Sequence, residues 1–259
     1  MPHIIFIHGT NAGPWTMENL AQYFSAEGYT VESPAYRYHD PTPVETEAEH
    51  LIQTSIADYV DDIATVVSKS NERPILIGHS LGGIVAQHLA SRGLARAIIL
   101  LNGSVNAGTL PTTDEERTLV KALISSGPFW ERTLLPDFAT MAKYGLNKLP
   151  VADQHRVFDQ LGPESGRVMF ELFLWMFDSH HTTRIDYSAI TCPVLMVSGS
   201  EDLAIPPSTA RLMAQKHRHA EFHIAEGFGH YMQLEPRWRE IATLISNWMQ
   251  QAITKKKGR

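Results

Sequence analysis

The chain has 259 residues, of which 43% are hydrophobic and 19% are charged, a composition that suits one substantial core with an inserted subdomain. Its formal net charge of −6 argues against a nucleic-acid-binding protein, which needs a basic face. A single cysteine, no signal peptide ahead of the first apolar run, and no apolar run of roughly 18 residues together indicate a cytoplasmic protein that does not span a membrane.

Short apolar runs alternate with longer segments of helical period along the chain. The predicted strands are residues 3–7, 30–33, 74–77, 97–101, 194–197 and 221–224. Apolar residues spaced by three and four predict helices over 56–67, from 84 to Gly93, and over 238–248. Several strands lack polar alternation, as expected when helices cover both faces. The pattern therefore predicts an α/β fold with an open, mostly parallel, doubly wound sheet.

The stretch between Ser104 and Tyr187 breaks this alternation, because about 80 residues pass without a convincing strand. We interpret residues 105–187 as an inserted helical cap, and residues 1–104 and 188–259 as the core. The apolar segment 170–177 is predicted to be a helix that is covered on two sides. Its aromatic residues are candidates for lining a substrate pocket: Phe170, Phe173, Trp175 and Phe177. The alternative is that these rings pack only within the cap.

A glycine-rich motif, Gly78-His79-Ser80-Leu81-Gly82-Gly83, follows one predicted strand and opens a predicted helix. A Gly-x-Ser-x-Gly turn in this context holds its serine in a strained backbone conformation. The residues two before and two after the serine must then lack bulky side chains, and Gly78 and Gly82 meet this requirement. The turn projects Ser80 above the carboxyl edge of the sheet, so Ser80 is the predicted nucleophile.

A serine hydroxyl is a poor nucleophile near neutral pH and needs a base within hydrogen-bonding reach. His230 lies in a loop between the last predicted strand and the last helix, which places it at the same sheet edge as Ser80. It is therefore the predicted general base. The pair His180-His181 has no carboxylate or cysteine at ligand spacing nearby, so no metal site is predicted.

The acid that orients the base should follow another strand at this edge. The loop after residues 194–197 supplies two carboxylates, Glu201 and Asp202. Asp202 is favoured because its shorter side chain sits at the turn after the strand, and its role is to fix the imidazole tautomer and stabilise the imidazolium. Glu201 remains the alternative acid; otherwise it is a solvated loop charge.

The negative charge that develops on a substrate oxygen needs two preorganised donors. The backbone N–H of Leu81, directly after the nucleophile, is the first candidate. The second candidate is the N–H of Thr10, in the loop that follows the first predicted strand. The alternative is that this loop is a plain turn.

Together these residues resemble the α/β-hydrolase superfamily, and the likeness covers essentially the whole chain. Its order of nucleophile, acid and base matches Ser80, Asp202 and His230, each after its own strand. Within the superfamily, the chain resembles the small capped bacterial serine esterases. It differs from haloalkane dehalogenases, which have an aspartate at the position of Ser80.

The residues and this resemblance imply a serine hydrolase that cleaves small to medium uncharged esters or lactones through an acyl-enzyme. The expected partner is the small-molecule ester, with no cofactor, metal, nucleic acid or membrane, and the chain is expected to be a monomer or homodimer. The same fold and elbow also occur in cofactor-free lyases and dioxygenases. A non-catalytic sensor that kept the pocket is a further alternative.

Overall fold

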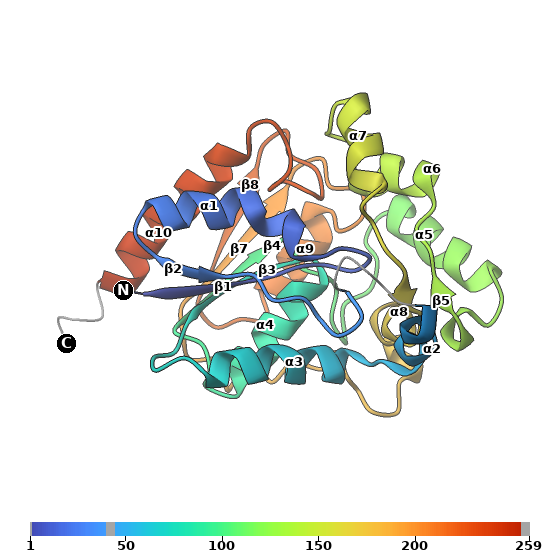
Figure 1. Cartoon of the computed structure of the whole chain (residues 1–259), viewed down its shortest axis with the longest axis horizontal. Helices are drawn as coiled ribbons and strands as arrows, with labels where there is room; N and C mark the ends of the chain where they lie inside the picture. The colour runs from blue at the N-terminus through green and yellow to red at the C-terminus, as the bar shows by residue number, and fades with distance from the viewer. Residues whose placement is uncertain (1, 40–44, 255–259) are drawn as a thin grey trace.

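The computed structural model covers residues 2–39 and 45–254, and a six-stranded parallel sheet lies at its centre (Figure 1). The strands are β1 (His3–Ile7), β2 (Thr30–Glu32), β3 (Ile75–His79), β4 (Ala97–Leu101), β7 (Val194–Gly199) and β8 (Ala220–Ala225). Their order across the sheet is β2-β1-β3-β4-β7-β8, and all neighbours are parallel. The direction of winding reverses between β1 and β3. Ligands of open parallel sheets bind at the carboxyl edge beside such a reversal.

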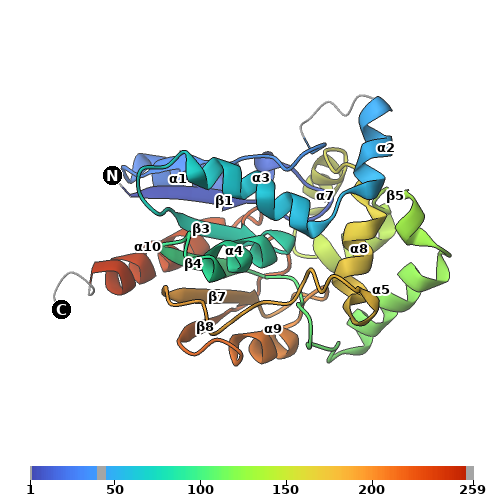
Figure 2. The ribbon, with the colours of Figure 1, turned by 90° about the horizontal axis from the view of Figure 1, so that it is seen from below.

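Helices cover both faces of the sheet (Figures 1 and 2). One face packs against α1 (Glu18–Ala26) and α10 (Trp238–Thr254), and the other against α3 (Ile56–Ser68), α4 (Leu81–Ser91) and α9 (Pro207–Ala214). Alternate strand residues serve the two faces, as the period of two requires. The predicted α/β fold with a doubly wound sheet is therefore confirmed, including all six predicted strands.

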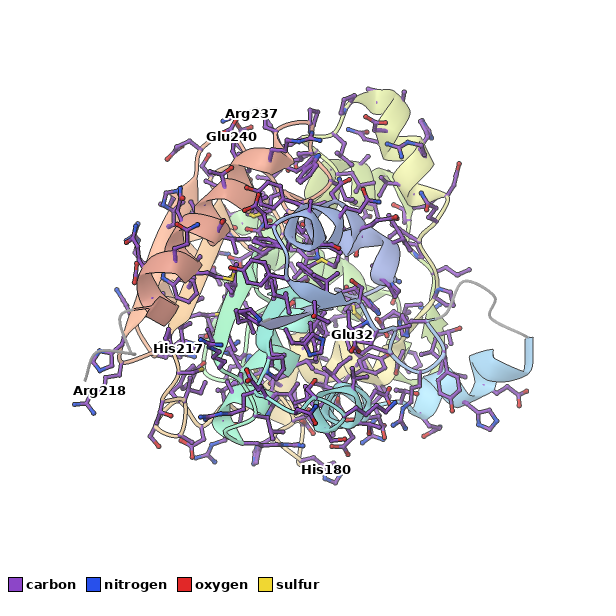
Figure 3. All side chains as sticks on the ribbon, turned by 60° about the vertical axis from the view of Figure 1, so that its left-hand side comes forward. Glu32, His180, His217, Arg218, Arg237 and Glu240 are labelled. Carbon is purple, nitrogen blue, oxygen red and sulfur yellow. The ribbon has the colours of Figure 1, made fainter. Side chains whose placement is uncertain are left out.

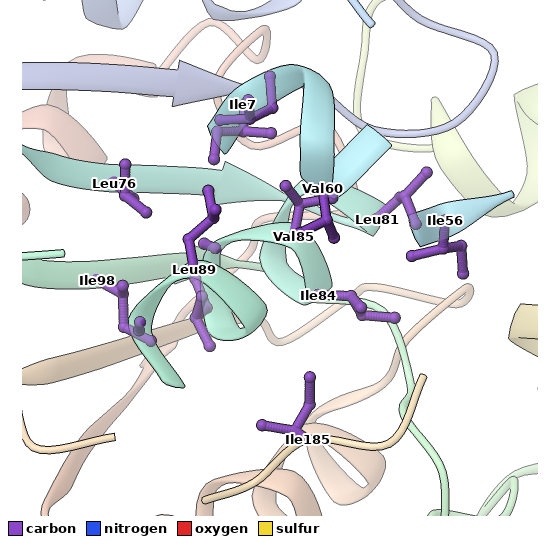
Figure 4. Close-up of a cluster of buried hydrophobic side chains, with 14 of the residues drawn as sticks. Ile7, Ile56, Val60, Leu76, Leu81, Ile84, Val85, Leu89, Ile98 and Ile185 are labelled. Atoms are coloured by element: carbon purple, nitrogen blue, oxygen red, sulfur yellow. The ribbon is translucent and has the colours of Figure 1, made fainter. Parts of the chain in front are cut away.

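The apolar side chains of α4 anchor the elbow to the sheet. Leu81, Ile84, Val85 and Leu89 are fully buried, and they pack against sheet residues such as Leu76 (Figure 4). Burying one such side chain contributes roughly 1.5–3 kcal/mol. The helix that follows the nucleophile therefore has a fixed position relative to β3.

Many charged residues lie on the outer surface. At the start of α10, Arg237 pairs with Glu240 at 2.6 Å, and both side chains are more than half exposed (Figure 3). An exposed pair of this kind contributes at most about 1 kcal/mol. The apolar clusters on the two faces of the sheet are therefore the main source of stability.

The segment between β4 and β7 lies beyond the carboxyl ends of the strands (Figures 1 and 2). It contains α5 (Asp114–Ser125), β5 (Thr133–Leu134), α6 (Phe138–Thr140), α7 (Val151–Phe158), β6 (Glu164–Ser165) and α8 (Gly166–Phe173), with a π-helical turn at Met141–Gly145 and 3-10 turns at Phe129–Glu131 and Trp175–Phe177. A further 3-10 turn, Pro14–Met17, precedes α1. One helix from the other part of the chain, α2 (Glu45–Gln53), contacts β5, β6 and α8.

Two features of this segment differ from the sequence prediction. The strands β5 and β6 form a small antiparallel pair, which two residues each are too few to reveal as a pattern. The helix expected over 170–177 begins earlier and ends at Phe173, because Leu174 leaves helical geometry at φ −116° and ψ 31°.

Of the helices in residues 2–39 and 45–254, none has the length and apolarity needed to cross a membrane.

Candidate active site

Ser80 lies at the sharp turn between β3 and α4. Its backbone has φ 50° and ψ −120°, a positive-φ conformation that is uncommon for a residue with a side chain. A Cβ atom on Gly78 would overlap the carbonyl group of Gly82, and one on Gly82 would overlap the carbonyl oxygen of Ile7. The two glycines therefore permit the turn, and the turn holds Ser80 at the carboxyl edge of the sheet.

Ser104, which the sequence prediction missed, contacts the serine directly. Ser80 Oγ and Ser104 Oγ share a hydrogen bond of 3.1 Å, and the Ser104 N–H donates to the Ser80 carbonyl at 2.9 Å. Among the described residues, no hydrogen bond joins Ser80 Oγ to His230. The available sequence signal was the position of Ser104, shortly after the strand that neighbours β3 in the sheet.

His230 and Asp202 form a buried hydrogen-bonded pair in the loops after β8 and β7. His230 Nδ1 lies 2.8 Å from Asp202 Oδ2. The other carboxylate oxygen, Oδ1, accepts two backbone N–H groups of its own loop at 2.8 and 2.9 Å. A carboxylate at Nδ1 fixes the tautomer that leaves Nε2 as the acceptor. The alternative acid, Glu201, instead pairs with Lys148 at 2.6 Å and is half exposed.

Two buried side chains hold the backbone of the loop that carries His230. Asn102 Nδ2 donates to the carbonyl oxygens of Gly229 and His230, both at 2.8 Å, and its Oδ1 accepts the Gly199 N–H at 2.8 Å. His79 Nε2 donates to the same His230 carbonyl at 2.9 Å, and the two rings lie 4.9 Å apart. Burial, together with the nearby His230, lowers the pKa of His79 well below its usual value, so His79 stays neutral.

Glu235 supports this loop from the other side. Its Oε1 accepts the N–H of Gly229 at 2.8 Å, and the residue is 4% exposed. Burial raises the pKa of Glu235 to about 7, although the hydrogen bond from Gly229 and the charge of Lys148 oppose the shift. The sequence prediction did not single out Asn102 or Glu235, because amide and carboxylate contacts to backbone atoms leave no spacing pattern.

The two predicted oxyanion donors are backbone amides at the same sheet edge. The Leu81 amide is the first of α4, where a helix leaves its N–H groups unpaired and carries partial positive charge. In the described part of the chain, neither this N–H nor that of Thr10 donates to a protein acceptor. The next amide, that of Asn11, is already engaged, because it donates to Glu164 Oε2 at 3.2 Å.

A cavity of about 580 Å³ lies between this sheet edge and the segment that follows β4. Ser80, His230 and Thr10 all line it. Most of the remaining wall is apolar, with contributions from α5, α8 and the segment 133–141: Leu119, Ala122, Leu123, Leu134, Leu135, Pro136, Met141, Met169, Leu172 and Phe173. Arg132 and Asp137 add charged groups. A more open groove of about 680 Å³ lies between β8 and α10, and Ser80, His230 and Thr10 are not part of its lining.

The four aromatic residues expected to line the pocket lie in different places. Phe173 lines the cavity. Phe170 instead contacts the Trp130 ring, with centroids 5.7 Å apart, and Phe177 is 70% exposed. Trp175 is half-buried in the 3-10 turn and is outside the lining. The expectation treated 170–177 as one helix, but the helix ends at Phe173, so the later residues leave its face.

The pair His180-His181 lies in a turn that Asp178 closes. The Asp178 carboxylate accepts the His180 N–H at 2.9 Å. No group of three or more His, Cys, Asp or Glu side chains in residues 2–39 and 45–254 is arranged to hold a metal ion.

Several known proteins are similar to this chain in sequence or in structure. The sequence is 26% identical over 212 residues to a protein from Pantoea ananatis that is named as a carbamate hydrolase, RutD, and the match covers 78% of this chain and 73% of that protein. A monoacylglycerol lipase from Paleococcus ferrophilus superposes with a TM-score of 0.71, at 19% identity over 96% of this chain and 94% of the lipase chain. Tomato methylketone synthase I in complex with 2-tridecanone gives 0.74, at 16% identity over 96% and 98% of the two chains.

At such low identity, the likeness to solved structures establishes only the fold. The family is established by the sequence itself, because the model described as the alpha/beta hydrolase family matches residues 4–243. That range contains the elbow and both loops that carry the buried His230–Asp202 pair. The chain therefore belongs to the alpha/beta hydrolase family.

Proposed function

We propose that the protein is a serine hydrolase that cleaves small to medium uncharged carboxylic esters or lactones through an acyl-Ser80 intermediate. One observation carries this proposal: Ser80, on its strained elbow, lines the same cavity as His230, whose Nδ1 is bonded to the buried Asp202. A nucleophile, a base and an orienting acid in this relation are the requirement for acyl transfer.

In the proposed first step, Ser80 Oγ attacks the ester carbonyl carbon while His230 Nε2 takes its proton. In the free protein, Ser80 Oγ is hydrogen-bonded to Ser104 Oγ. This step therefore requires Ser80 Oγ to exchange that hydrogen bond for one to His230 Nε2. The N–H groups of Thr10 and Leu81 stabilise the oxyanion of the tetrahedral intermediate. His230 then returns the proton to the leaving alcohol, and the acyl-enzyme forms.

In the proposed second step, His230 removes a proton from water, which attacks the acyl carbonyl. The intermediate collapses, the carboxylic acid leaves, and Ser80 regains its proton from His230. Asp202 stabilises the imidazolium in both steps. These steps use only groups of this chain and water.

The wall of the cavity supports the proposed substrate class. Its lining is largely apolar, which favours uncharged acyl and alcohol groups, and its volume of about 580 Å³ suits a ligand of modest size. The name of the relative from Pantoea ananatis adds carbamates as a class to assay. We further propose that residues 105–187 act as the cap of a core made of residues 1–104 and 188–259, since both parts contribute to the cavity wall.

A fluorophosphonate probe tests the proposal. We expect stoichiometric covalent labelling of Ser80, located by peptide mass spectrometry, and turnover of p-nitrophenyl esters with a loss of at least about 10³-fold in Ser80→Ala. The Ser80→Ala variant, with an unchanged melting temperature, is the control. Absence of labelling in the folded protein would refute acylation and favour a lyase or dioxygenase. Labelling without turnover of esters or carbamates would point to a non-catalytic sensor.

A further inference from the structure

We propose that Glu164, a buried residue of the cap segment, positions the oxyanion loop after β1, so that docking of the cap sets the geometry of the Thr10 donor. The proposal rests on the proposed acyl-transfer function and adds a positioning residue that lies outside the cavity wall. It follows from a direct contact between β6 and the backbone next to Thr10.

Glu164 accepts hydrogen bonds from both sides of the junction between cap and core. The residue has no exposed surface. Its Oε2 accepts the Asn11 N–H at 3.2 Å and lies 3.3 Å from His39 Nε2. Its Oε1 accepts the Tyr59 hydroxyl and the Ser165 N–H, both at 2.7 Å. A buried carboxylate with four donors has one well-defined position, because leaving any donor unpaired costs about 1–3 kcal/mol.

Asn11 is held by the cap segment through its backbone N–H, its backbone carbonyl and its side-chain Nδ2. It has a positive φ of 57°, and its side-chain Nδ2 donates to the carbonyl oxygens of Leu134 and Gly162 at 3.3 and 2.9 Å. Its own carbonyl accepts the Gly162 N–H at 2.8 Å. The peptide plane between Thr10 and Asn11 is therefore fixed from the cap. The Thr10 N–H lies in the preceding plane, between Gly9 and Thr10, and the φ and ψ torsions of Thr10 connect the two planes.

The charge state of Glu164 and the residues around it suits the hydrogen bond from the Asn11 N–H. The positive charge and hydrogen bond of His39 lower the pKa of Glu164 despite its burial, and the same pair raises the pKa of His39. Tyr59 also donates to Glu164, and more distant neighbours are Tyr36, Asp62 and His8. Burial lowers the pKa of His8 to about 3, so it stays neutral. Glu164 is thus a carboxylate, the state that accepts from all four donors.

The contact also separates the roles of two adjacent amides. Glu164 engages the Asn11 N–H, while the Thr10 N–H has no protein acceptor in the described part of the chain. Without Glu164, the loop could rotate either amide toward the cavity. Removing one oxyanion donor costs about 10² to 10³ in kcat, so a misplaced donor is expected to cost about 10-fold or more.

Glu171 offers a matched control within the same cap segment. It is also a buried carboxylate, 2% exposed, and it joins α8 to the core. It accepts the Ser55 hydroxyl at 2.8 Å and the Ile56 N–H at 2.8 Å, at the start of α3, and pairs with Arg167 at 3.0 Å. It therefore docks the cap to the core without contacting the oxyanion loop.

The experiment compares Glu164→Ala, Glu171→Ala and the wild type in the full chain. We expect both variants to lower the melting temperature. Only Glu164→Ala is expected to reduce kcat by at least about 10-fold with KM changed less than 3-fold, because the oxyanion forms only in the transition state. The inhibition constant of a trifluoromethyl ketone, which forms a tetrahedral adduct, should rise in proportion to the loss of kcat. Inhibition by a carboxylate product should change little.

Asn11→Gly provides a second variant, which tolerates the positive φ, removes the two side-chain bonds to the cap and shortens one side chain of the cavity wall. We expect a smaller loss of kcat than in Glu164→Ala, with the same effect on the two inhibition constants. If Glu164→Ala does not fold, Asn11→Gly alone tests whether the cap positions the oxyanion loop. Equal kcat losses in Glu164→Ala and Glu171→Ala, or wild-type kcat in folded Asn11→Gly, would overturn the inference. Failure of the proposed function has a different signature, because the wild type itself would then not be labelled at Ser80.

Discussion

At the scale of single residues, Asn102 connects two loops of the candidate site. Its amide donates to the loop that carries His230 and accepts from Gly199, at the end of the strand that leads to Asp202. In Asn102→Asp, a buried carboxylate oxygen would face the carbonyl oxygens of Gly229 and His230. We expect a loss of about 1–3 kcal/mol of stability or more and a fall in kcat of about 10-fold or more. Chemical denaturation and ester kinetics measure the two effects.

Asn106→Asp is the matched control for that prediction. Asn106 is equally buried and lies in the same loop, but its Oδ1 accepts from Lys216. Among the described residues, it makes no hydrogen bond to the loop that carries His230. An aspartate there loses the 3.4 Å hydrogen bond to Gln87 Oε1, but its negative charge lies beside the Lys216 ammonium group. We therefore expect kcat to stay within about 3-fold of the wild type. A similar fall in kcat in both variants would show that Asn102 acts only through general stability.

At the scale of elements, the end of α8 at Phe173 separates an aromatic residue that lines the cavity from one that is exposed. Phe173 lines the cavity, whereas Phe177 is 70% exposed beyond the helix end. Phe173→Ala enlarges the cavity, so the preferred acyl chain in a p-nitrophenyl ester series should lengthen by a few carbons. Each added methylene that becomes buried can contribute up to about 0.8 kcal/mol to kcat/KM. Phe177→Ala should leave the chain-length profile unchanged, and a shift in that variant as well would contradict this placement.

The elements also show what the sequence could and could not predict. Strand β4 and the first three residues of β3 are uninterrupted apolar runs, and the elbow needs Gly78 and Gly82. The strands and the elbow were therefore predictable from local sequence patterns. The end of α8 at Phe173 left none, because the segment up to Phe177 stays apolar after helical geometry stops. The role of Glu164 also left no pattern, since three of its four partners are distant in sequence and two of the four are backbone amides.

At the scale of the whole molecule, Glu235 links stability to pH. Its pKa is about 7 in the folded chain against a usual 4.5, so the folded state binds more protons between these values. Stability contributed by this group is therefore present at low pH and is lost as the pH rises from about 4.5 through 7. Glu235→Gln keeps an acceptor for the Gly229 N–H and removes the titration. We expect it to raise the free energy of unfolding at pH 8 by up to about 3 kcal/mol and at pH 4 by much less.

Denaturant unfolding at several pH values measures this difference between variant and wild type. Glu226→Gln, at a nearby exposed position, controls for the loss of one negative charge. A gain that is the same at pH 4 and pH 8 would contradict the assignment of the titration to Glu235. Contributions from other titrating groups, such as His39, are common to both proteins and cancel in the comparison.

The attachment of the proposed cap, residues 105–187, has a consequence for protein engineering. Residues 105–187 lie in the connection between β4 and β7. A chimaera could therefore exchange them for the corresponding segment of a relative to change substrate preference. The donor cap would also have to bring a carboxylate for the Asn11 N–H, the contact that Glu164 makes here. A transplanted segment chosen only for its pocket residues would leave that amide without an acceptor. Under the proposed role of Glu164, modular exchange in this scaffold has to conserve one residue that lies outside the cavity wall.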